Sequence, residues 1–322
     1  MAVINYTVPS DYLKTCRLDS YIAGLPGGMN RSKLKNGVKS ITINGKAQKI
    51  SYKVKPGDNI LIEWEDSVPE DIIAQPIPLE IIYEDKNVCV VNKPQGMVTH
   101  PASGNWENTL VNGLLYHWGR ENIKGIKEGS ISQQLVKRRP GIVHRLDKDT
   151  SGIIITAKNR DSEEYLQKQF QNHKFLVKEY ICICCGIPPK KHDTITTQII
   201  RDPRNRKIFK AVTDSNEGKI AVSEYQCIST YGNYSLMRIR IKTGRTHQIR
   251  VHMKFINCPI LGDPLYGKKD KQFPDATLML HSRMLKIFIP DNKEKQMFKT
   301  STPERFLKVE QKLKRMFPKC ML

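Results

Sequence analysis

Residues 141–158 read GIVHRLDKDTSGIIITAK. The second half contains an unbroken run of β-branched residues, IIIT, which indicates a strand buried on both faces. In the first half, His144 and Leu146 would share one face of an extended segment. Arg145 and Asp147 would share the other face. The stretch therefore predicts a core strand with a carboxylate held rigidly at its start.

Asp147 allows two interpretations. As one half of a surface ion pair with Arg145 or Lys148, it would contribute about 0–1 kcal/mol to stability. As a catalytic group, it would supply a carboxylate that is ionised at neutral pH and can act as a nucleophile or base without further activation. The rigid anchor provided by the strand favours the catalytic interpretation.

The composition is strongly basic. The 322 residues include 53 Lys and Arg against 32 Asp and Glu, a net charge of +21, and the pI is about 9.6. Such a charge suits a polyanion or, less well, an anionic membrane surface. The N-terminal residues MAVINYTVPSDY show no secretory pattern, and the chain has no run of about 18 apolar residues. We therefore expect a soluble, cytoplasmic protein that does not associate with membranes.

The eight cysteines form no disulfide or zinc framework. Their cluster ICICC at residues 181–185 lacks Cys-x-x-Cys pairs, so we expect these side chains to pack in a strand as small hydrophobes. His247 and His252 are five residues apart, whereas a helical zinc site pairs histidines four apart. The sequence therefore predicts no metal site.

The charge balance predicts two domains. Residues 1–60 contain ten Lys or Arg against three Asp, whereas residues 61–80 contain no basic residue, six acidic residues and three prolines. Prolines favour an extended, non-helical path. We predict a small basic domain at residues 1–67, a linker at residues 68–79 and a larger domain at residues 80–322.

The small domain shows helical patterns at residues 17–25 and 30–38, followed by strands around the Asn44-Gly45 turn. Cations near the helical turn suit phosphate contact, and we favour RNA binding over a merely solvated charged face. The residues concerned are Arg31, Lys33 and Lys35.

The larger domain combines few helices with many strands. Helical periodicity occurs at residues 108–118, at residues 161–172 and near the C-terminus, while most other apolar runs are strand-like. This pattern favours an α+β or mixed α/β fold with a largely antiparallel, mixed sheet. A polar loop before Asp147 carries a basic cluster, interpreted as a phosphate-contacting patch rather than a solvated loop. The cluster is Lys137, Arg138 and Arg139.

A second polar segment, KTGRTHQIRVHM, occupies residues 242–253. Thr246 would cap a helix on which Arg245, Ile249 and His252 fall at roughly helical spacing. Arg245 would then lie at a strand-to-helix turn, within reach of an anion. The alternative is a helix with solvated Arg and His side chains.

At these residues the sequence resembles the RluA family of RNA pseudouridine synthases, and the N-terminal part resembles an S4 RNA-binding domain. A lone HRLD would be a weak signal, but the shared segments occur in the family's order over nearly the whole chain. They are NKPQGMVTHP (92–101), RPGIVHRLDKDTSGIIITAK (139–158), the Lys-x-Tyr element (178–180), KTGRTHQIRVHM (242–253), LGDPLYG (261–267) and LHSRMLKIFIP (280–290).

The resemblance implies roles for five residues. Asp147 would be the catalytic carboxylate, and Arg145 would fill the space left by the flipped-out uridine. Tyr180 would pack against the flipped uracil. Arg245 would pair with the catalytic carboxylate and orient it. Leu285 would make an apolar contact beneath the base.

The implied reaction breaks the N1–C1′ bond of uridine, rotates the uracil and rejoins it through C5. It requires no redox step, energy source, metal or cofactor. Asp147 would attack C1′, add to C6 of the uracil or remove a proton from C2′, and the sequence leaves these three routes open. Extruding a base costs a few kcal/mol, which stacking on Tyr180 and insertion of Arg145 would offset.

The resemblance further implies a monomeric enzyme whose partner is structured RNA, foremost 23S ribosomal RNA or precursor ribosomal particles. A tRNA-directed synthase of the same family is one alternative. A non-catalytic RNA-binding or ribosome-assembly protein is another. A metal-dependent RNA hydrolase would need a cluster of carboxylates or histidines, which the sequence does not show.

Overall fold

The structure is a computed structural model. It describes residues 2–25, 34, 38–64, 72–102, 104–119, 141–172, 176–205, 207–213 and 217–318. The chain divides into two compact units, the first formed mainly by residues 1–72 and the second mainly by residues 73–322. Six of the predicted RNA-contacting residues lie outside the described residues: Arg31, Lys33, Lys35, Lys137, Arg138 and Arg139.

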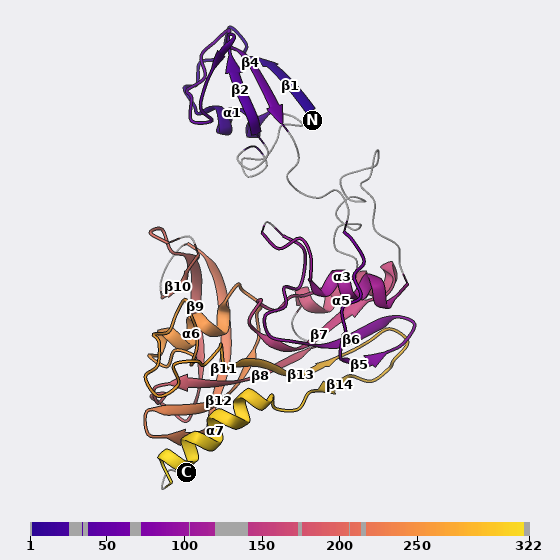
Figure 1. Cartoon of the computed structure of the whole chain (residues 1–322), viewed down its shortest axis with the longest axis vertical. Coiled ribbons are helices and arrows are strands. Elements are labelled where there is room, and N and C mark those ends of the chain that lie inside the picture. The colour runs from indigo at the N-terminus through magenta and orange to yellow at the C-terminus, as the bar shows by residue number, and fades with distance from the viewer. Residues whose placement is uncertain are drawn as a thin grey trace. The chain divides into compact units, whose positions relative to one another are not determined.

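The first unit contains a four-stranded antiparallel sheet (Figure 1). Helix α1 (Leu18–Gly24) contributes Leu18 and Ile22 to its core. The turn between β2 and β3 has positive φ at both Asn44 and Gly45, 52° and 75°, a backbone that the Asn-Gly pair favours. The helix and the turn were predicted, whereas β1 was not. The strands are β1 (Ala2–Thr7), β2 (Val38–Ile43), β3 (Lys46–Ala47) and β4 (Asn59–Trp64), in the order β1-β4-β2-β3.

The second unit is built on a ten-stranded sheet in the order β10-β9-β11-β12-β8-β13-β7-β6-β5, with β14 paired to β13 (Figure 1). All these pairs are antiparallel except the parallel pair β13–β7. The prediction of an α+β fold with a largely antiparallel, mixed sheet is therefore confirmed. The strands are β5 (Ile81–Glu84), β6 (Val88–Lys93), β7 (Ser151–Ala157), β8 (Val177–Cys185), β9 (His192–Arg201), β10 (Phe209–Val212), β11 (Lys219–Tyr231), β12 (Tyr234–Ile241), β13 (Leu280–Ile287) and β14 (Gln296–Lys299).

Helices cover both faces of this sheet. Because side chains alternate along β7, Ile153 packs in a core cluster with Leu166, while Ile154 packs in a larger cluster with Leu114. Strand β7 is thus buried on both faces, as its isoleucine run predicted. The helices are α3 (Leu110–His117), α5 (Arg160–Asn172), α6 (Gln248–Phe255) and α7 (Glu304–Met316).

Local hydrogen bonds set the element boundaries. The helical pattern predicted from residue 161 is confirmed as α5, which begins one residue earlier at Arg160 because Asn159 Oδ1 accepts the N–H of Ser162 at 2.9 Å. Cys182 and Cys184 are buried in β8, as expected for strand packing. Within the described residues, no helix is long and apolar enough to cross a membrane.

Candidate active site

The loop that carries Asp147 is supported from behind by the segment NKPQGMVTHP. Thr99 Oγ1 donates to the carbonyl of Leu146 at 2.9 Å, just before Asp147. The fully buried ammonium of Lys93 donates to the carbonyl of Lys148 at 3.2 Å, just after it. Burial lowers the pKa of Lys93 to about 8, against the opposing effect of Asp147. Because buried carbonyls require donors, these contacts fix the backbone on both sides of Asp147.

Side chains alternate as predicted in the loop of residues 144–150, called the catalytic loop for the role that the resemblance implies for Asp147. Leu146 is buried in the core, and His144 Nε2 accepts the N–H of Ile155 at 3.0 Å. Arg145 and Asp147 line a pocket, to which Leu146 also contributes. The loop therefore anchors His144 and Leu146 in the protein and presents the charged groups of Arg145 and Asp147 to a ligand.

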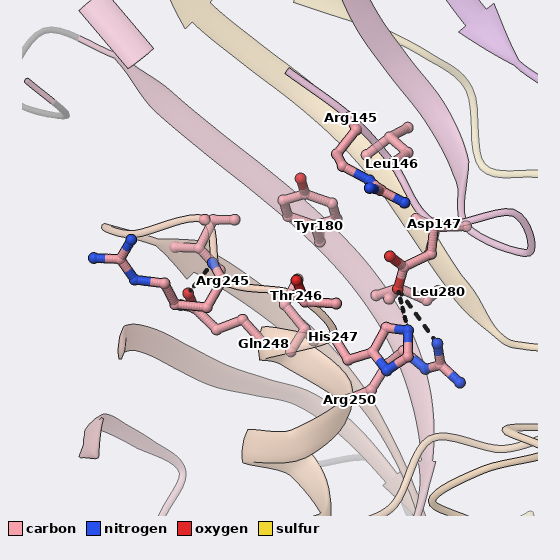
Figure 2. A pocket seen from close by; sticks show the side chains of 14 residues that line it. Arg145, Leu146, Asp147, Tyr180, Arg245, Thr246, His247, Gln248, Arg250 and Leu280 are labelled. Atoms are coloured by element: carbon pink, nitrogen blue, oxygen red, sulfur yellow. Dashed lines mark hydrogen bonds and ion pairs between the residues drawn. The ribbon is translucent and has the colours of Figure 1, made fainter. Parts of the chain in front are cut away.

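The pocket has a volume of about 110 Å³, whereas a single water needs about 10–15 Å³ (Figure 2). Arg145 and Asp147 come from the catalytic loop, and Tyr180 comes from β8. The opposite wall is formed by the segment from Gly244 to Arg250. The structure thus brings together at one pocket four of the predicted site residues, Asp147, Tyr180, Arg145 and Arg245.

Tyr180 presents its ring to the pocket while its side chain is largely enclosed, with 6% of the residue exposed. Burial raises the pKa of Tyr180 to about 12, and the charge of Asp147 acts in the same direction. A hydrogen bond with Ser282 opposes this shift without cancelling it. The hydroxyl therefore keeps its proton at neutral pH, and the ring serves as an apolar wall.

Arg250 is the arginine that pairs with Asp147. Its Nη1 lies 3.3 Å from Asp147 Oδ2. Its Nε and Nη2 donate to the two oxygens of Asp263 at 2.7 and 2.8 Å. The side chains of Arg250 and Asp263 are 6% and 0% exposed. Burial lowers the pKa of Arg250, but the hydrogen bonds and charge of Asp263 outweigh it, so the net pKa is raised and the cation is permanent.

The predicted pairing of Arg245 with Asp147 is wrong. Arg245 lines the pocket, but its Nε donates to the carbonyl of Ile220 at 3.0 Å and its guanidinium points away from Asp147 (Figure 2). Helix α6 starts at Gln248 after His247 at the N-cap, so Thr246 is not its cap. Arg245 therefore precedes the helix and does not lie on its inner face.

Sequence reasoning missed Arg250 although a signal was present. Arg250 lies between Ile249 and Val251, both of which are buried. A cation among buried apolar residues is costly unless an acidic group pairs with it. The LGDPLYG segment supplies that group as Asp263, so the two motifs together pointed to a buried ion pair.

Leu285 does not reach the pocket, which corrects the predicted contact beneath the base. It is buried in the core cluster that includes Phe170, while Leu280 lines the pocket from the same strand. Leu280 and Leu285 are five residues apart, so the alternation of side chains along β13 places them on opposite faces of the sheet, in different core clusters. The resemblance alone had placed Leu285 at the base.

Three potential metal ligands lie together outside the pocket. Atoms of Glu84, Cys89 and His117 are within 4.8 Å of one another. Glu84 already pairs with His117 Nε2 at 2.7 Å and with Lys158 Nζ at 2.8 Å. Burial raises the pKa of Cys89 to about 12, which disfavours the thiolate that a metal would need. The cluster fits an ion-pair network better than a metal centre.

Comparison with known proteins identifies the family. Residues 87–255, which include the catalytic loop, β8 and α6, match the RNA pseudouridylate synthase family. A Borreliella burgdorferi protein named ribosomal large subunit pseudouridine synthase D is 44% identical over 297 residues, covering 90% of this chain and 87% of that protein. A Bacillus subtilis protein named as an uncharacterized RNA pseudouridine synthase is 36% identical over 309 residues, covering 95% and 97%.

The fold agrees with this assignment. The solved structure of human RNA pseudouridylate synthase domain containing 4 matches with a TM-score of 0.55 at 23% identity, covering 73% of this chain and 93% of that one. The chain therefore belongs to the RNA pseudouridine synthase family, of the RluA type that its motifs resemble, and is an isomerase that acts on uridine in RNA.

Proposed function

We propose that this chain converts specific uridines of large-subunit (23S) ribosomal RNA to pseudouridine, with Asp147 as the reacting carboxylate. The observation that carries the proposal is the placement of Asp147, 21% exposed at the pocket with Oδ2 held by Arg250. In the described part of the chain, Oδ1 has no hydrogen-bond partner, so it is the oxygen left to meet the nucleoside. The choice of RNA rests on relatives named ribosomal large subunit pseudouridine synthase D.

The pocket residues suit the steps of the reaction. Tyr180 and Leu280 offer apolar surface to a flipped uracil. Arg250 fixes the direction of the Asp147 carboxylate without leaving its own partner, Asp263. Arg145 is exposed at the pocket, where its guanidinium can enter the space that the base leaves in the RNA. The uracil rejoins the sugar through C5, and the C5 hydrogen leaves as a proton, so the redox state does not change.

Arg245 gains a different role from the one predicted, as a contact for the RNA on either side of the target. It lines the central pocket and two neighbouring cavities. One of these also contains Phe209 and Lys219, and the other contains Lys178. A flipped nucleotide remains joined to its neighbours, so the strand must leave the pocket on two sides. Cations and an aromatic ring along these exits suit phosphates and bases.

The first unit is proposed to be an S4-like RNA-binding domain. Residues 1–67 carry ten Lys or Arg against six Asp or Glu, three of these acidic residues lying after residue 60, so the domain has a net positive charge, and its described lysines from Lys46 to Lys55 are exposed. We assign residues 1–67 to this domain, residues 68–79 to a linker and residues 80–322 to the catalytic domain. The enzyme is expected to act as a cytoplasmic monomer, on free RNA or precursor ribosomal particles, without a cofactor.

The test compares RNA from cells that lack the gene and carry the wild type, Asp147→Asn or Asp149→Asn. Asp149 belongs to the same loop but does not line the pocket, so its variant is the matched control. Carbodiimide labelling and primer extension locate pseudouridines in ribosomal and transfer RNA. We expect sites in large-subunit RNA to disappear without the gene and to return with the wild type and Asp149→Asn only.

Other outcomes would redirect the proposal. Sites lost only from transfer RNA would favour the tRNA-directed alternative. Sites restored by Asp147→Asn would refute the role of Asp147. If no site depends on the gene, a non-catalytic RNA-binding role becomes the better explanation.

A further inference from the structure

His247 occupies an unusual position beside the catalytic carboxylate. It is the N-cap of α6 with φ 55° and ψ 18°, a left-handed conformation that side chains other than glycine rarely adopt. Its Nε2 lies 3.8 Å from Asp147 Oδ2 (Figure 2). Surrounding contacts must stabilise such a strained backbone conformation, and conformations of this kind cluster at functional sites.

The contact on the other side of the ring determines where the proton of His247 lies. Tyr266 Oη is 2.9 Å from His247 Nδ1 and also accepts the backbone N–H of Phe209 at 2.9 Å. Among the described residues, Oη has no other hydrogen-bond partner. Because Phe209 is itself a donor, Nδ1 is the one acceptor among the described residues for the hydroxyl proton, and this proton is satisfied only when Tyr266 donates to Nδ1. Neutral His247 then carries its proton on Nε2, the nitrogen that faces Asp147.

The charges around the ring keep it neutral. Burial is the largest influence and lowers the pKa of His247 from its ordinary value. Arg250 from α6 and Arg145 from the catalytic loop act in the same direction, while Asp147 and Asp263 act against it. Burial also raises the pKa of Tyr266, so its hydroxyl remains a donor. The uncharged ring of Phe209 packs edge-to-face against the ring of His247, with 5.7 Å between the two centroids.

We propose that His247 is a positioning residue for Asp147. Its tautomer, set by Tyr266, directs a neutral Nε2–H toward Oδ2 from 3.8 Å, which is beyond hydrogen-bond length, so that the N–H dipole orients the carboxylate. This inference rests on the proposed function, because His247 acts through Asp147. It also gives the LGDPLYG segment a role, since that segment supplies both Asp263, which holds Arg250, and Tyr266, which holds His247. One loop therefore sets both groups that face Asp147 Oδ2.

The first test is independent of activity. Long-range proton–nitrogen NMR of the full chain with ¹⁵N-histidine shows which ring nitrogen carries the proton, and His247→Gln identifies the signal. At neutral pH we expect a neutral ring protonated on Nε2, and a loss of this fixed tautomer in Tyr266→Phe. A ring protonated on Nδ1, or an imidazolium, would overturn the proposal.

The second test measures the single-turnover rate on saturating RNA. His247→Ala should lower the rate by about 10- to 100-fold, as expected for a lost positioning contact, with RNA affinity unchanged. His247→Gln keeps an N–H at the place of Nε2 and should restore most of the rate. His192→Gln, at an exposed position of β9, is the control. A wild-type rate for His247→Ala would overturn the proposal.

The pH profile separates positioning from mere structural support. Removing the hydroxyl in Tyr266→Phe removes a donor to neutral His247, so its pKa should rise and the acid limb of the rate profile should move to higher pH. A limb that stays in place would contradict the proposed role. If Asp147→Asn is inactive while His247→Ala is fully active, only this inference fails. If Asp147→Asn is active, the proposed function fails with it.

Discussion

Arg250 forms ion pairs with both Asp263 and Asp147. Replacing Arg250 by methionine should show how much the first pair contributes to stability and how much the second contributes to the reaction. Arg250 and Asp263 are 6% and 0% exposed. The variant leaves Asp263 as a buried charge without a cation, which costs about 3–5 kcal/mol. In a domain of about 250 residues, 1 kcal/mol corresponds to about 2–4 °C in melting temperature, so the second unit should melt about 6–20 °C lower.

A second substitution should recover the stability but not the reaction. Asparagine in place of Asp263 removes the charge and keeps an oxygen for the N–H groups of Leu265 and Tyr266, which donate at 2.9 and 3.1 Å. The coupling energy between Arg250→Met and Asp263→Asn should approach about 3 kcal/mol, the upper end for neighbouring residues. Asp147 Oδ2 still lacks its Nη1 partner in the double variant, so turnover should remain low.

Two assays read the two effects. Calorimetric melting follows the stability of each variant. Release of tritium from RNA labelled at uracil C5 follows the reaction, because forming the C5–C1′ bond expels the C5 hydrogen. We expect Arg250→Met to lose about 10²- to 10³-fold in single-turnover rate, as for one lost charge-stabilising donor. A double variant that regains both stability and rate would show that Arg250 acts only through the fold. An unchanged melting temperature in Arg250→Met would refute the energetic argument.

Four further predictions follow from the same contacts. Arg245→Gln should weaken RNA binding and lower the salt slope by about 0.7 per lost phosphate contact, with Arg245→Lys as the charge-preserving control; a lower rate on saturating RNA with unchanged affinity would contradict this role. His252 and His281 are buried, with pKa values lowered by burial to about 4 and about 3. The unfolded chain takes up their protons near pH 6.5 and the folded chain does not, so the free energy of unfolding should fall by about 1.4 kcal/mol per pH unit for each histidine below pH 6.5. Denaturant titrations from pH 7 to pH 5 test this slope, which His252→Gln should reduce and which should be absent if these rings are protonated in the folded state. Replacing Lys46, Lys49 and Lys53 of the first unit by Gln should reduce the salt dependence of RNA binding, and an unchanged slope would count against an RNA contact there. A chelator should leave tritium release unchanged, and inhibition reversed by one particular metal would disprove the metal-free reaction.

The elements that the sequence predicted well depend on local signals. The isoleucine run of residues 153–155 places apolar side chains on both faces of a strand, so both faces require apolar partners, and β7 has them. The period of the C-terminal helix placed Phe306, Val309, Leu313 and Met316 on one face; the first three are buried, and Met316 at the helix end is half-buried against the same cluster. Alternation also placed Asp147 opposite the buried Leu146. These positions could be predicted because they depend on the periodicity of a few neighbouring residues. In the folded protein, packing against distant residues stabilises the same arrangement.

The errors arose where the local sequence carries no signal for the contact or backbone conformation that decides a position. The strand of residues 2–7 lacks a flanking turn signal that pairs it locally, because its partner is β4, more than fifty residues away. Leu285 was assigned by resemblance, whereas its place in β13 puts it on the face opposite to Leu280. Histidine rarely adopts a positive φ, and the local sequence gives no signal for one, so the first residue of α6 could not be predicted from the sequence.

That last irregularity determines the charge distribution around the catalytic carboxylate. If α6 began directly after Thr246, Arg245 would lie close to the face of the helix that carries Ile249 and point toward the protein interior. Because His247 turns the chain first, Arg250 and the ring of His247 approach Asp147, while Arg245 lines the pocket and its neighbouring cavities with its guanidinium directed away. Among the described residues, the arginine paired with Asp147 is Arg250, already shared with Asp263, and the Nε2 atom of His247 lies 3.8 Å away. Two cations at Oδ2 would hold the carboxylate more tightly in its ion pair and oppose its reaction with the nucleoside. The left-handed turn thus leaves one arginine for the carboxylate and the other for the proposed contact with RNA.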